Sequence, residues 1–255
     1  MDRGAYVAVS GSMAQERAMD VIANNLANIN TGGYKADRVL FETYLQKNMS
    51  PGANIRSPQD IKSSSPQPAA DSTYIVTSQV YTDFSQGPLR RTDRLFDVAL
   101  MSDGFIAVET DAGERYWRGG TTQVNQKGEL VTPDGYRLLD INKKPVTVGL
   151  VKFRITEDGT ILNEQNLPIT KIRLVDFPDK STLIKQGSGL YSASDSKKAV
   201  QSQASIRQGF TEGSNINPVA EMTRMITALR AYEAFRKSIQ SDDEMTARLI
   251  GDVAR

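Results

Sequence analysis

Met19-Asp-Val-Ile-Ala-Asn-Asn-Leu-Ala-Asn-Ile-Asn-Thr-Gly-Gly-Tyr-Lys35 is the stretch that decides the fold of this 255-residue chain. Apolar residues from Ala14 to Ile29 recur at spacings of three and four, which predicts a helix. Three asparagines lie inside that pattern, although their side chains compete with the helix backbone for hydrogen bonds. The pair Gly32-Gly33 supplies the left-handed conformation that ends a helix. Such a helix, made of small residues and amides, needs a close partner that can form hydrogen bonds.

The C-terminal end of the chain offers that partner. Asn215-Ile-Asn-Pro218 combines an asparagine N-cap with proline at the first helical position. Between Pro218 and Gly251 there is no glycine, and no further proline follows Pro218, so the predicted helix continues to about Val253. Its apolar stripe is close to a heptad, although Arg236 interrupts it. The stripe contains Met222, Met225, Ile226, Leu229, Tyr232, Phe235 and Ile239. We expect this helix to pair with the N-terminal one.

Between the two helices the pattern changes to extended segments and short strands. Tyr34 to Leu45 is expected to form an extended arm or a short hairpin, and Asn48 to Ser72 is a linker rich in proline and serine. From about Tyr74 to Ser194, runs of four to six residues alternate with glycine-containing turns, which predicts an antiparallel sandwich or irregular barrel. Ile169 to Phe177 is the longest strand candidate. Trp117, the only tryptophan, is expected in the core or half-buried on a strand.

The predicted strands are Asp97–Met101, Phe105–Thr110, Arg115–Arg118, Glu129–Thr132, Tyr136–Asp140, Val151–Ile155 and Ile169–Phe177. The fold class is therefore α+β: terminal helices packed as a coiled-coil-like pair, with an inserted, mainly antiparallel β domain. We divide the chain into an N-terminal helix (1–33), an arm and linker (34–72), a β domain (73–198), a return arm (199–213) and a C-terminal helix (214–255).

Composition argues against most enzyme classes. The chain has neither cysteine nor histidine, so it lacks the thiolate, the commonest general base and the commonest metal ligand. No serine or threonine has an obvious base to activate it. We assign no catalytic residue, no metal ligand and no cofactor. A glycosidic enzyme would need two carboxylates about 5 to 9.5 Å apart, which spacing in the sequence cannot show.

Charge and hydropathy exclude further partners. There are 31 basic and 30 acidic residues, which gives no reason to expect nucleic acid or an anionic membrane as partner. Only Ala5 to Val9 is apolar-leaning before Ser10-Gly11, too short for a signal-peptide core or a membrane span. Composition alone therefore predicts a cytoplasmic protein.

Three segments carry a resemblance to a known family. MAQERAMDVIANNLANINTGGYK (13–35) resembles the N-terminal signature of the rod and hook family of flagellar axial proteins, and GFTEGSNINPVAEMTRMITALRAYE (209–233) resembles its C-terminal signature. FSQGPLRRTDRLFDVALMSDGFIAVET (84–110) is similar to the opening of the core domain of rod proteins. The opening MDRGAY and the short middle look most like the proximal rod branch, with the distal rod branch a close alternative.

The resemblance implies a structural, non-enzymatic subunit of the bacterial flagellar basal-body rod, located in the periplasm. It implies a helical assembly with other rod proteins and possibly with copies of itself, which transmits torque, and delivery by the flagellar type III export apparatus. Alternatives are a distal rod or hook-type subunit and a periplasmic glycan-binding module. An ordinary antiparallel helix pair would bury little surface, and short helices are marginal in water, so packing of helices from many subunits explains the sequence better.

We expect the assembly interface to use both terminal helices. At least one asparagine of the N-terminal helix should bond a group of another helix and so fix axial register. The candidate interface residues are Val21, Ile22, Asn24, Asn25, Leu26, Asn28, Ile29, Met222, Met225, Ile226, Leu229, Tyr232, Phe235 and Ile239.

Overall fold

The computed structural model describes residues 3–46, 72–149, 152–193 and 199–253. The linker predicted over Asn48–Ser72 lies outside these ranges, apart from Ser72 itself. The chain forms two compact units. We call residues 1–24, 38–81 and 219–255 the helical unit, and residues 25–37 and 82–218 the β unit. The chain therefore passes between the units four times.

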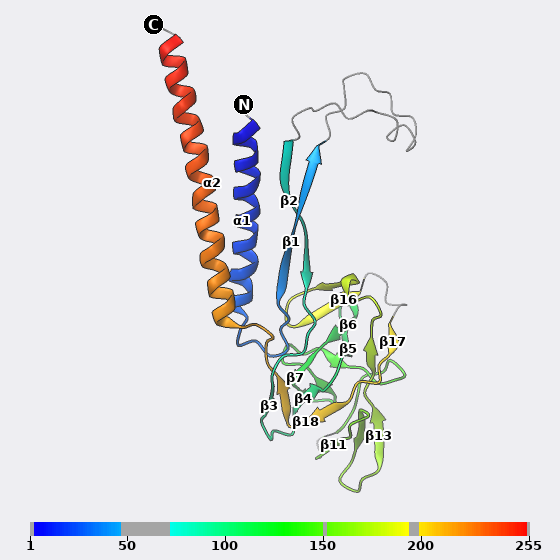
Figure 1. Cartoon of the computed structure of the whole chain (residues 1–255). Helices are drawn as coiled ribbons and strands as arrows, with labels where there is room; N and C mark the ends of the chain where they lie inside the picture. Colours follow the sequence, from blue (N-terminus) through cyan, green and yellow to red (C-terminus); the bar gives the residue numbers. More distant parts are fainter. Residues whose placement is uncertain (1–2, 47–71, 150–151, 194–198, 254–255) are drawn as a thin grey trace, which may run out of the picture. The chain divides into compact units, whose positions relative to one another are not determined.

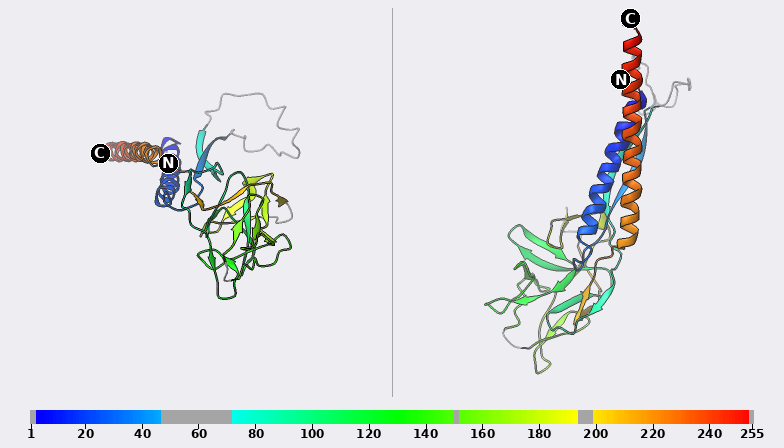
Figure 2. Two further views of the ribbon diagram at one scale, coloured as in Figure 1. Left: turned by 90° about the horizontal axis from the view of Figure 1, so that it is seen from below. Right: turned by 90° about the vertical axis from the view of Figure 1, so that its left-hand side faces the viewer.

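Two helices run side by side in the helical unit (Figures 1 and 2). Helix α1 spans Arg3–Ala27 and helix α2 spans Pro218–Val253. They run in opposite directions, with the N-terminus of α1 beside the C-terminal half of α2 (Figure 1). Helix α2 begins at Pro218, which confirms the predicted start. Proline is favourable at this position because its missing N–H would have no partner within the helix. Helix α1 ends five residues before the predicted glycines.

Hydrogen-bonded turns continue the chain from the end of α1 to Gly33. Asn28 N–H donates to the carbonyl of Asn25, and Thr31 N–H donates to the carbonyl of Asn28. Gly33 has a φ of 68°, the left-handed conformation that the sequence led us to expect here. The glycine therefore ends this series of turns, and not the α-helix itself.

The helical unit also contains a pair of long strands. Strand β1 spans Asp37–Gln46 and strand β2 spans Ser72–Thr82, and together they form a two-stranded sheet. Strand β1 occupies most of the segment expected to be extended. Arg38, near its start, pairs with Glu221 in the first turn of α2 at 2.7 Å.

The β unit is built from short strands, and the pairings among its described strands are antiparallel, which confirms the predicted α+β class. Its strands are β3 (Leu89–Arg91), β4 (Asp97–Leu100), β5 (Phe105–Thr110), β6 (Gly113–Trp117), β7 (Gly119–Thr121), β8 (Gln123–Val124), β9 (Leu130–Val131), β10 (Arg137–Leu138), β11 (Arg154–Ile155), β12 (Thr160–Leu162), β13 (Pro168–Lys171), β14 (Leu174–Asp176), β15 (Leu183–Lys185), β16 (Leu190–Ala193), β17 (Val200–Gln201), β18 (Ile206–Gln208) and β19 (Phe210–Glu212). A short 3-10 helix, η2, spans Lys180–Thr182.

These strands form four sheets. The largest has nine strands, with β15-β16-β6-β5-β10-β9-β8 as its main path and β14 joining β5 to β17. The smaller sheets are β11-β12-β13, β18-β4-β7 and β19-β3. Side chains between the sheets form two apolar clusters, one of which includes Trp117, so the predicted burial of this tryptophan is confirmed.

The prediction of one long strand from Ile169 to Phe177 is wrong. The segment is divided into β13, which pairs with β12, and β14, which pairs with β5 and β17. Arg173 N–H, between the two strands, donates to the carbonyl of Leu139. A continuous apolar run shows that a segment is buried, but it carries no signal at the point where the chain changes from one sheet to another.

Candidate assembly surfaces

One face of α1 is made of small residues that allow close packing. Ala8, Ala14 and Ala18 are buried, and Ile22 continues the same side of the helix. Gly11 lies against the ring of Phe235 on α2: a Cβ atom at this position would be 2.5 Å from Cζ of that ring. Glycine therefore allows the aromatic ring to approach the backbone of α1, which a larger residue would prevent.

The predicted apolar stripe of α2 is divided between two faces of the helix. Met225, Tyr232, Phe235 and Ile239 are half-buried, on the same side as the buried Ala228. This inner face has the three-and-four spacing of a helix-packing seam.

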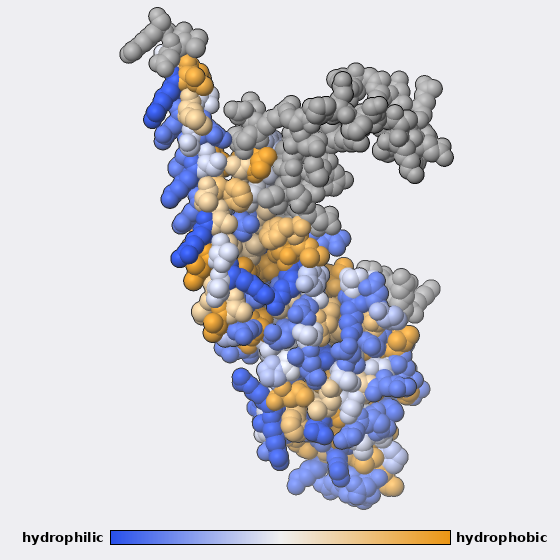
Figure 3. Space-filling view, in the orientation of Figure 1, coloured by the Kyte–Doolittle hydropathy of each residue, from blue (hydrophilic) through white to orange (hydrophobic). Residues whose placement is uncertain are grey.

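A second face of α2 is apolar and exposed. Its residues, which we call the outer stripe, are Val219, Met222, Ile226 and Leu229. Met222, Ile226 and Leu229 expose 52%, 53% and 45% of their surface. Apolar side chains gather at the lower end of α2 in Figure 3. Because their spacings are again three and four, the outer stripe can pack against a further helix.

Helix α1 carries an exposed apolar stripe as well. Tyr6, Val9 and Met13, which we call the N-terminal stripe, are exposed and follow each other at spacings of three and four. Each helix thus has one apolar face used within the chain and another that faces solvent. Large contiguous apolar patches on a protein surface are typical of interaction sites.

The residues predicted on α1 are distributed differently. Ile22 and Asn25 are buried, Val21 and Leu26 are half-buried, and Asn24 is exposed. Beyond the helix, Asn28 and Ile29 are half-buried in the turns.

Asn25 bonds a strand of its own chain. Its Oδ1 accepts from Asp37 N–H at 2.9 Å, and its Nδ2 donates to the carbonyl of Asp37 at 2.8 Å. The amide therefore pairs with the backbone at the start of β1 and closes the connection between α1 and that strand. The partner on another helix, expected for one of the asparagines, stays a prediction for Asn24 and Asn28.

A buried ionic cluster in the β unit was missed by the sequence analysis. Lys35 Nζ lies 2.6 Å from Oε1 of Glu212, and Arg118 Nε lies 2.9 Å from Oε2 of the same carboxylate. Burial lowers the pKa of Lys35, while the bond to Glu212 acts in the opposite direction. Lys35 closes the N-terminal signature and Glu212 lies inside the C-terminal one, so a charged residue of opposite sign in each was the available signal.

The polar connections extend around this cluster. Asn215 accepts from Ala36 N–H at 2.8 Å through Oδ1, and its Nδ2 donates to the carbonyl of Asp83 at 2.8 Å. Lys185 pairs with Asp37 at 2.9 Å and lies 4.1 Å from the ring centre of Tyr34. Burial raises the pKa of the Tyr34 hydroxyl to about 12, so the ring stays neutral beneath the cation.

Three family models match the chain. "Flagella basal body rod protein" matches residues 6–35, "Flagellar hook protein FlgE/F/G D1 domain" matches residues 99–165, and "Flagellar basal body rod FlgEFG protein C-terminal" matches residues 207–251. The flagellar basal-body rod protein FlgF of Caulobacter vibrioides is 32% identical over 249 residues, which covers 96% of each chain.

Rod proteins named FlgG are similar at the same level. FlgG of Buchnera aphidicola subsp. Schizaphis graminum is 32% identical over 258 residues, covering 96% of this chain and 97% of the relative. FlgG of Bacillus subtilis is 29% identical over 264 residues, covering 98% of both. The chain belongs to the flagellar basal-body rod protein family, of the FlgF and FlgG type.

Membership in the rod family identifies a structural subunit of the flagellar basal body and not an enzyme. Rod proteins assemble with other rod components. The N-terminal stripe lies in the first matched segment, and the outer stripe lies in the last. Each of the three segments contributes one residue of the ionic cluster: Lys35, Arg118 and Glu212.

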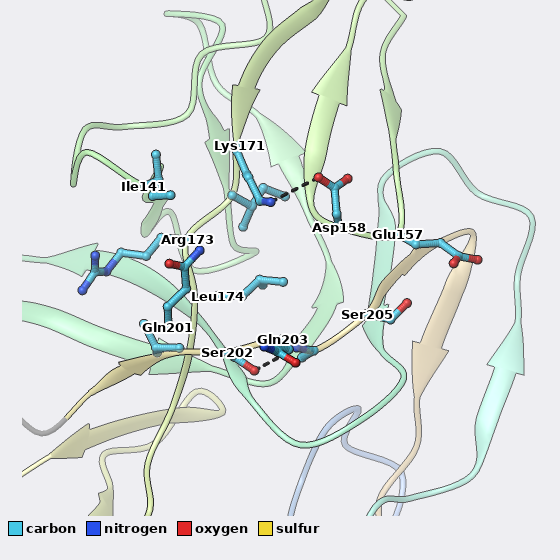
Figure 4. A pocket seen from close by; sticks show the side chains of 13 residues that line it. Ile141, Glu157, Asp158, Lys171, Arg173, Leu174, Gln201, Ser202, Gln203 and Ser205 are labelled. Atoms are coloured by element: carbon cyan, nitrogen blue, oxygen red, sulfur yellow. Dashed lines mark hydrogen bonds and ion pairs between the residues drawn. The ribbon is translucent and has the colours of Figure 1, made fainter.

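One pocket of this rod protein, lined by residues of several strands of the β unit, offers no catalytic arrangement. It has a volume of about 470 Å³ and lies in the β unit, with Lys171 bonded to Asp158 at 3.1 Å (Figure 4). Hydrogen bonds from Thr156 and Thr160 hold the pKa of Asp158 below its usual value, so this carboxylate does not serve as a proton donor near neutral pH. Its described lining has no aromatic side chain on which a sugar ring could stack.

Among the described residues of this rod protein, no helix combines the length and the hydropathy that a membrane span requires. Within the same ranges, no three histidine, cysteine or acidic side chains are grouped so that they could hold a metal ion.

Proposed function

We propose that this rod subunit assembles helically with its neighbours through the outer stripe of α2 and the N-terminal stripe of α1. Repeated contacts between subunits that are related by rotation and translation form an open helical assembly. A shaft built in this way transmits torque through side-by-side helices. The neighbours are other rod proteins and copies of this chain, and delivery is by the flagellar type III export apparatus.

The exposed stripes are the observation that carries the proposal. About half of the surface of Met222, Ile226 and Leu229 is exposed. Burying that exposed half against a neighbour would stabilise the interface by about 1 kcal/mol per side chain. No single contact of this size is sufficient, but repetition around every subunit makes the sum large. The other predicted interface residues, including Val21, Leu26 and Ile29, remain proposed contacts at the end of α1.

The functional division of the chain is also a proposal. Residues 1–33 and 214–255 would form the helical part of the shaft, and residues 73–198 a β domain attached to it. Residues 34–72 and 199–213 would connect the two. Strand β1 lies within residues 34–72 and pairs with β2, which begins at Ser72 and continues into residues 73–198.

Leu229→Asp tests the proposed interface in motile cells. An unpaired charge at a site that becomes buried costs several kcal/mol, so rod content in isolated basal bodies and motility should both be lost. Trp117 fluorescence of the purified variant should be unchanged, because Leu229 belongs to the other unit.

Ala234→Asp is the matched control. Ala234 is exposed on α2, and at about 100° per residue it lies away from both the inner face and the outer stripe. It should leave motility and rod content near normal. Normal rods with Leu229→Asp would refute the interface, and an equal loss with Ala234→Asp would refute the assignment to this particular face.

A further inference from the structure

We infer that Glu212 is the central residue of a buried ionic clamp, formed with Lys35 and Arg118. The clamp holds together, within the β unit, the chain segments that lead to and from the helical unit. All three residues belong to the β unit. The segments that they join, which we call the connectors, are residues 25–37, 82–88 and 212–218. Every passage of the chain between the two units begins or ends in one of them.

The carboxylate of Glu212 collects donors from three separate parts of the chain. Lys35 and the backbone N–H of Gly87 both donate to Oε1, at 2.6 and 2.9 Å. Arg118 donates to Oε2 at 2.9 Å. Lys35 in turn donates to the carbonyl of Ser85 at 2.7 Å. The Glu212 side chain thus links residues 25–37 to residues 82–88, and both to Arg118 at the end of strand β6.

Backbone bonds link the same connectors. Gly33 N–H donates to the carbonyl of Glu212 at 2.8 Å, and Asp83 N–H donates to the carbonyl of Ala36 at 2.8 Å. Gly213 N–H donates to the carbonyl of Pro88 at 2.8 Å. The connectors are therefore parts of one hydrogen-bonded structure and not independent linkers.

The charges of the clamp are unequal. The side chains of Lys35, Arg118 and Glu212 are 0%, 3% and 0% exposed, so two buried cations share one buried carboxylate. Asp103 is the other acid whose charge acts on Lys35, but its side chain is mostly exposed and is paired with Lys180 at 2.6 Å. The Nη1 atom of Arg118 donates to the carbonyl of Gly104 and its Nη2 atom is buried without a hydrogen-bond partner, so Glu212 supplies the carboxylate that pairs with this cation among the described residues.

Because two cations share one carboxylate, the clamp predicts which substitution is the more damaging, and packing alone would not predict the same order. Glu212→Gln preserves shape but leaves two buried cations without a carboxylate, which is strongly unfavourable. Lys35→Met removes more polar contact yet leaves Arg118 and Glu212 as a one-to-one pair. Glu212→Gln should therefore be the more damaging change, although it alters fewer atoms.

Hydrogen–deuterium exchange on the purified full-length chain measures this order. Glu212→Gln should accelerate exchange at the connectors on the order of 100- to 1,000-fold, the size expected when a buried ion pair loses one partner. Lys35→Met should accelerate it by no more than about 10-fold. Glu157→Gln is the control, because this carboxylate is exposed and its pair with Arg207 lies at the surface.

A double variant keeps the test decisive if Glu212→Gln does not fold. Lys35→Met combined with Glu212→Gln leaves one unpaired cation instead of two, so it should be better protected than Glu212→Gln alone. Equal effects of Glu212→Gln and Glu157→Gln would overturn the inference. So would a Lys35→Met variant that is as damaging as Glu212→Gln. Neither result depends on rod assembly, so the clamp can fail while the proposed interface stands, and the reverse.

Discussion

Asn25 is the residue at which a single side chain joins α1 to the start of β1, and replacing it with alanine tests that role. Its amide is 0% exposed and makes two hydrogen bonds, one to each backbone group of Asp37. Asn25→Ala leaves both the N–H and the carbonyl of Asp37 without this partner. A buried polar group that loses its partner costs about 1–3 kcal/mol.

The expected magnitude follows from these two bonds. Asp37 is half-buried, so the lower end of that range applies to each group, about 2 kcal/mol in total. Alanine favours a helix over asparagine by roughly 0.5 kcal/mol, which offsets part of the loss. We expect Asn25→Ala to lower the free energy of unfolding of the β unit by about 1.5 kcal/mol.

The assay is urea unfolding followed by the fluorescence of Trp117. This is the only tryptophan, and it lies in the core of the β unit, so its signal reports that unit without contribution from the helices. Asn30→Ala is the control: the same change, five residues further along the chain in the same unit, at an exposed position, with an expected effect within about 0.5 kcal/mol.

A second variant separates the two bonds. In Asn25→Asp the carboxylate still accepts from Asp37 N–H, but it cannot donate to the carbonyl and faces its oxygen instead. Asn25→Asp should therefore be at least as destabilising as Asn25→Ala at neutral pH, despite its similar shape. The reasoning is refuted if Asn25→Ala and Asn30→Ala unfold at the same urea concentration, or if Asn25→Asp is as stable as the parent chain.

Two further predictions concern the boundary between the units and the packing of the connectors. In hydrogen exchange on the isolated chain, α1 up to Asn24 and α2 from Val219 should exchange fast, because neither helix has enough apolar surface of its own. Residues 25–37 should be protected. Strong protection across both helices would contradict this prediction. Gly87→Ala should lower the free energy of unfolding by about 1–3 kcal/mol in the Trp117 assay, because its Cβ would clash with the carbonyl oxygen of Gly213. Gly251→Ala is the control, since a Cβ at that position has nothing within 4 Å and should leave the free energy of unfolding unchanged. Equal midpoints for the two variants would show that the connectors can move apart freely.

Several elements of the fold were determined by local sequence. Pro218 begins α2 because a proline is tolerated in the first turn, where its missing N–H has no partner to lose. Strand β5 has its predicted bounds, Phe105–Thr110, since an apolar run between two turns is a local signal. Gly33 was expected in the left-handed region because glycine enters it without a steric cost.

The candidate interface could be predicted only in part. The periodicity of α2 showed that Met222, Met225 and Leu229 are helical and apolar. It did not show that Met225 faces inward while Met222 and Leu229 face solvent. An apolar stripe wide enough for two contacts has the same spacing throughout, so the division between them depends on where the partner helix lies.

Tertiary structure alone decided which polar groups meet. Lys35 and Glu212 are 177 residues apart, and the opposite charges in the two signatures do not by themselves specify which residues pair. The same holds for the change of sheet at Ile172 and for the carbonyl of Gly213 opposite Gly87. Helices, turns and caps are set by interactions among near neighbours, whereas a buried charge is tolerated only when folding brings an opposite charge beside it.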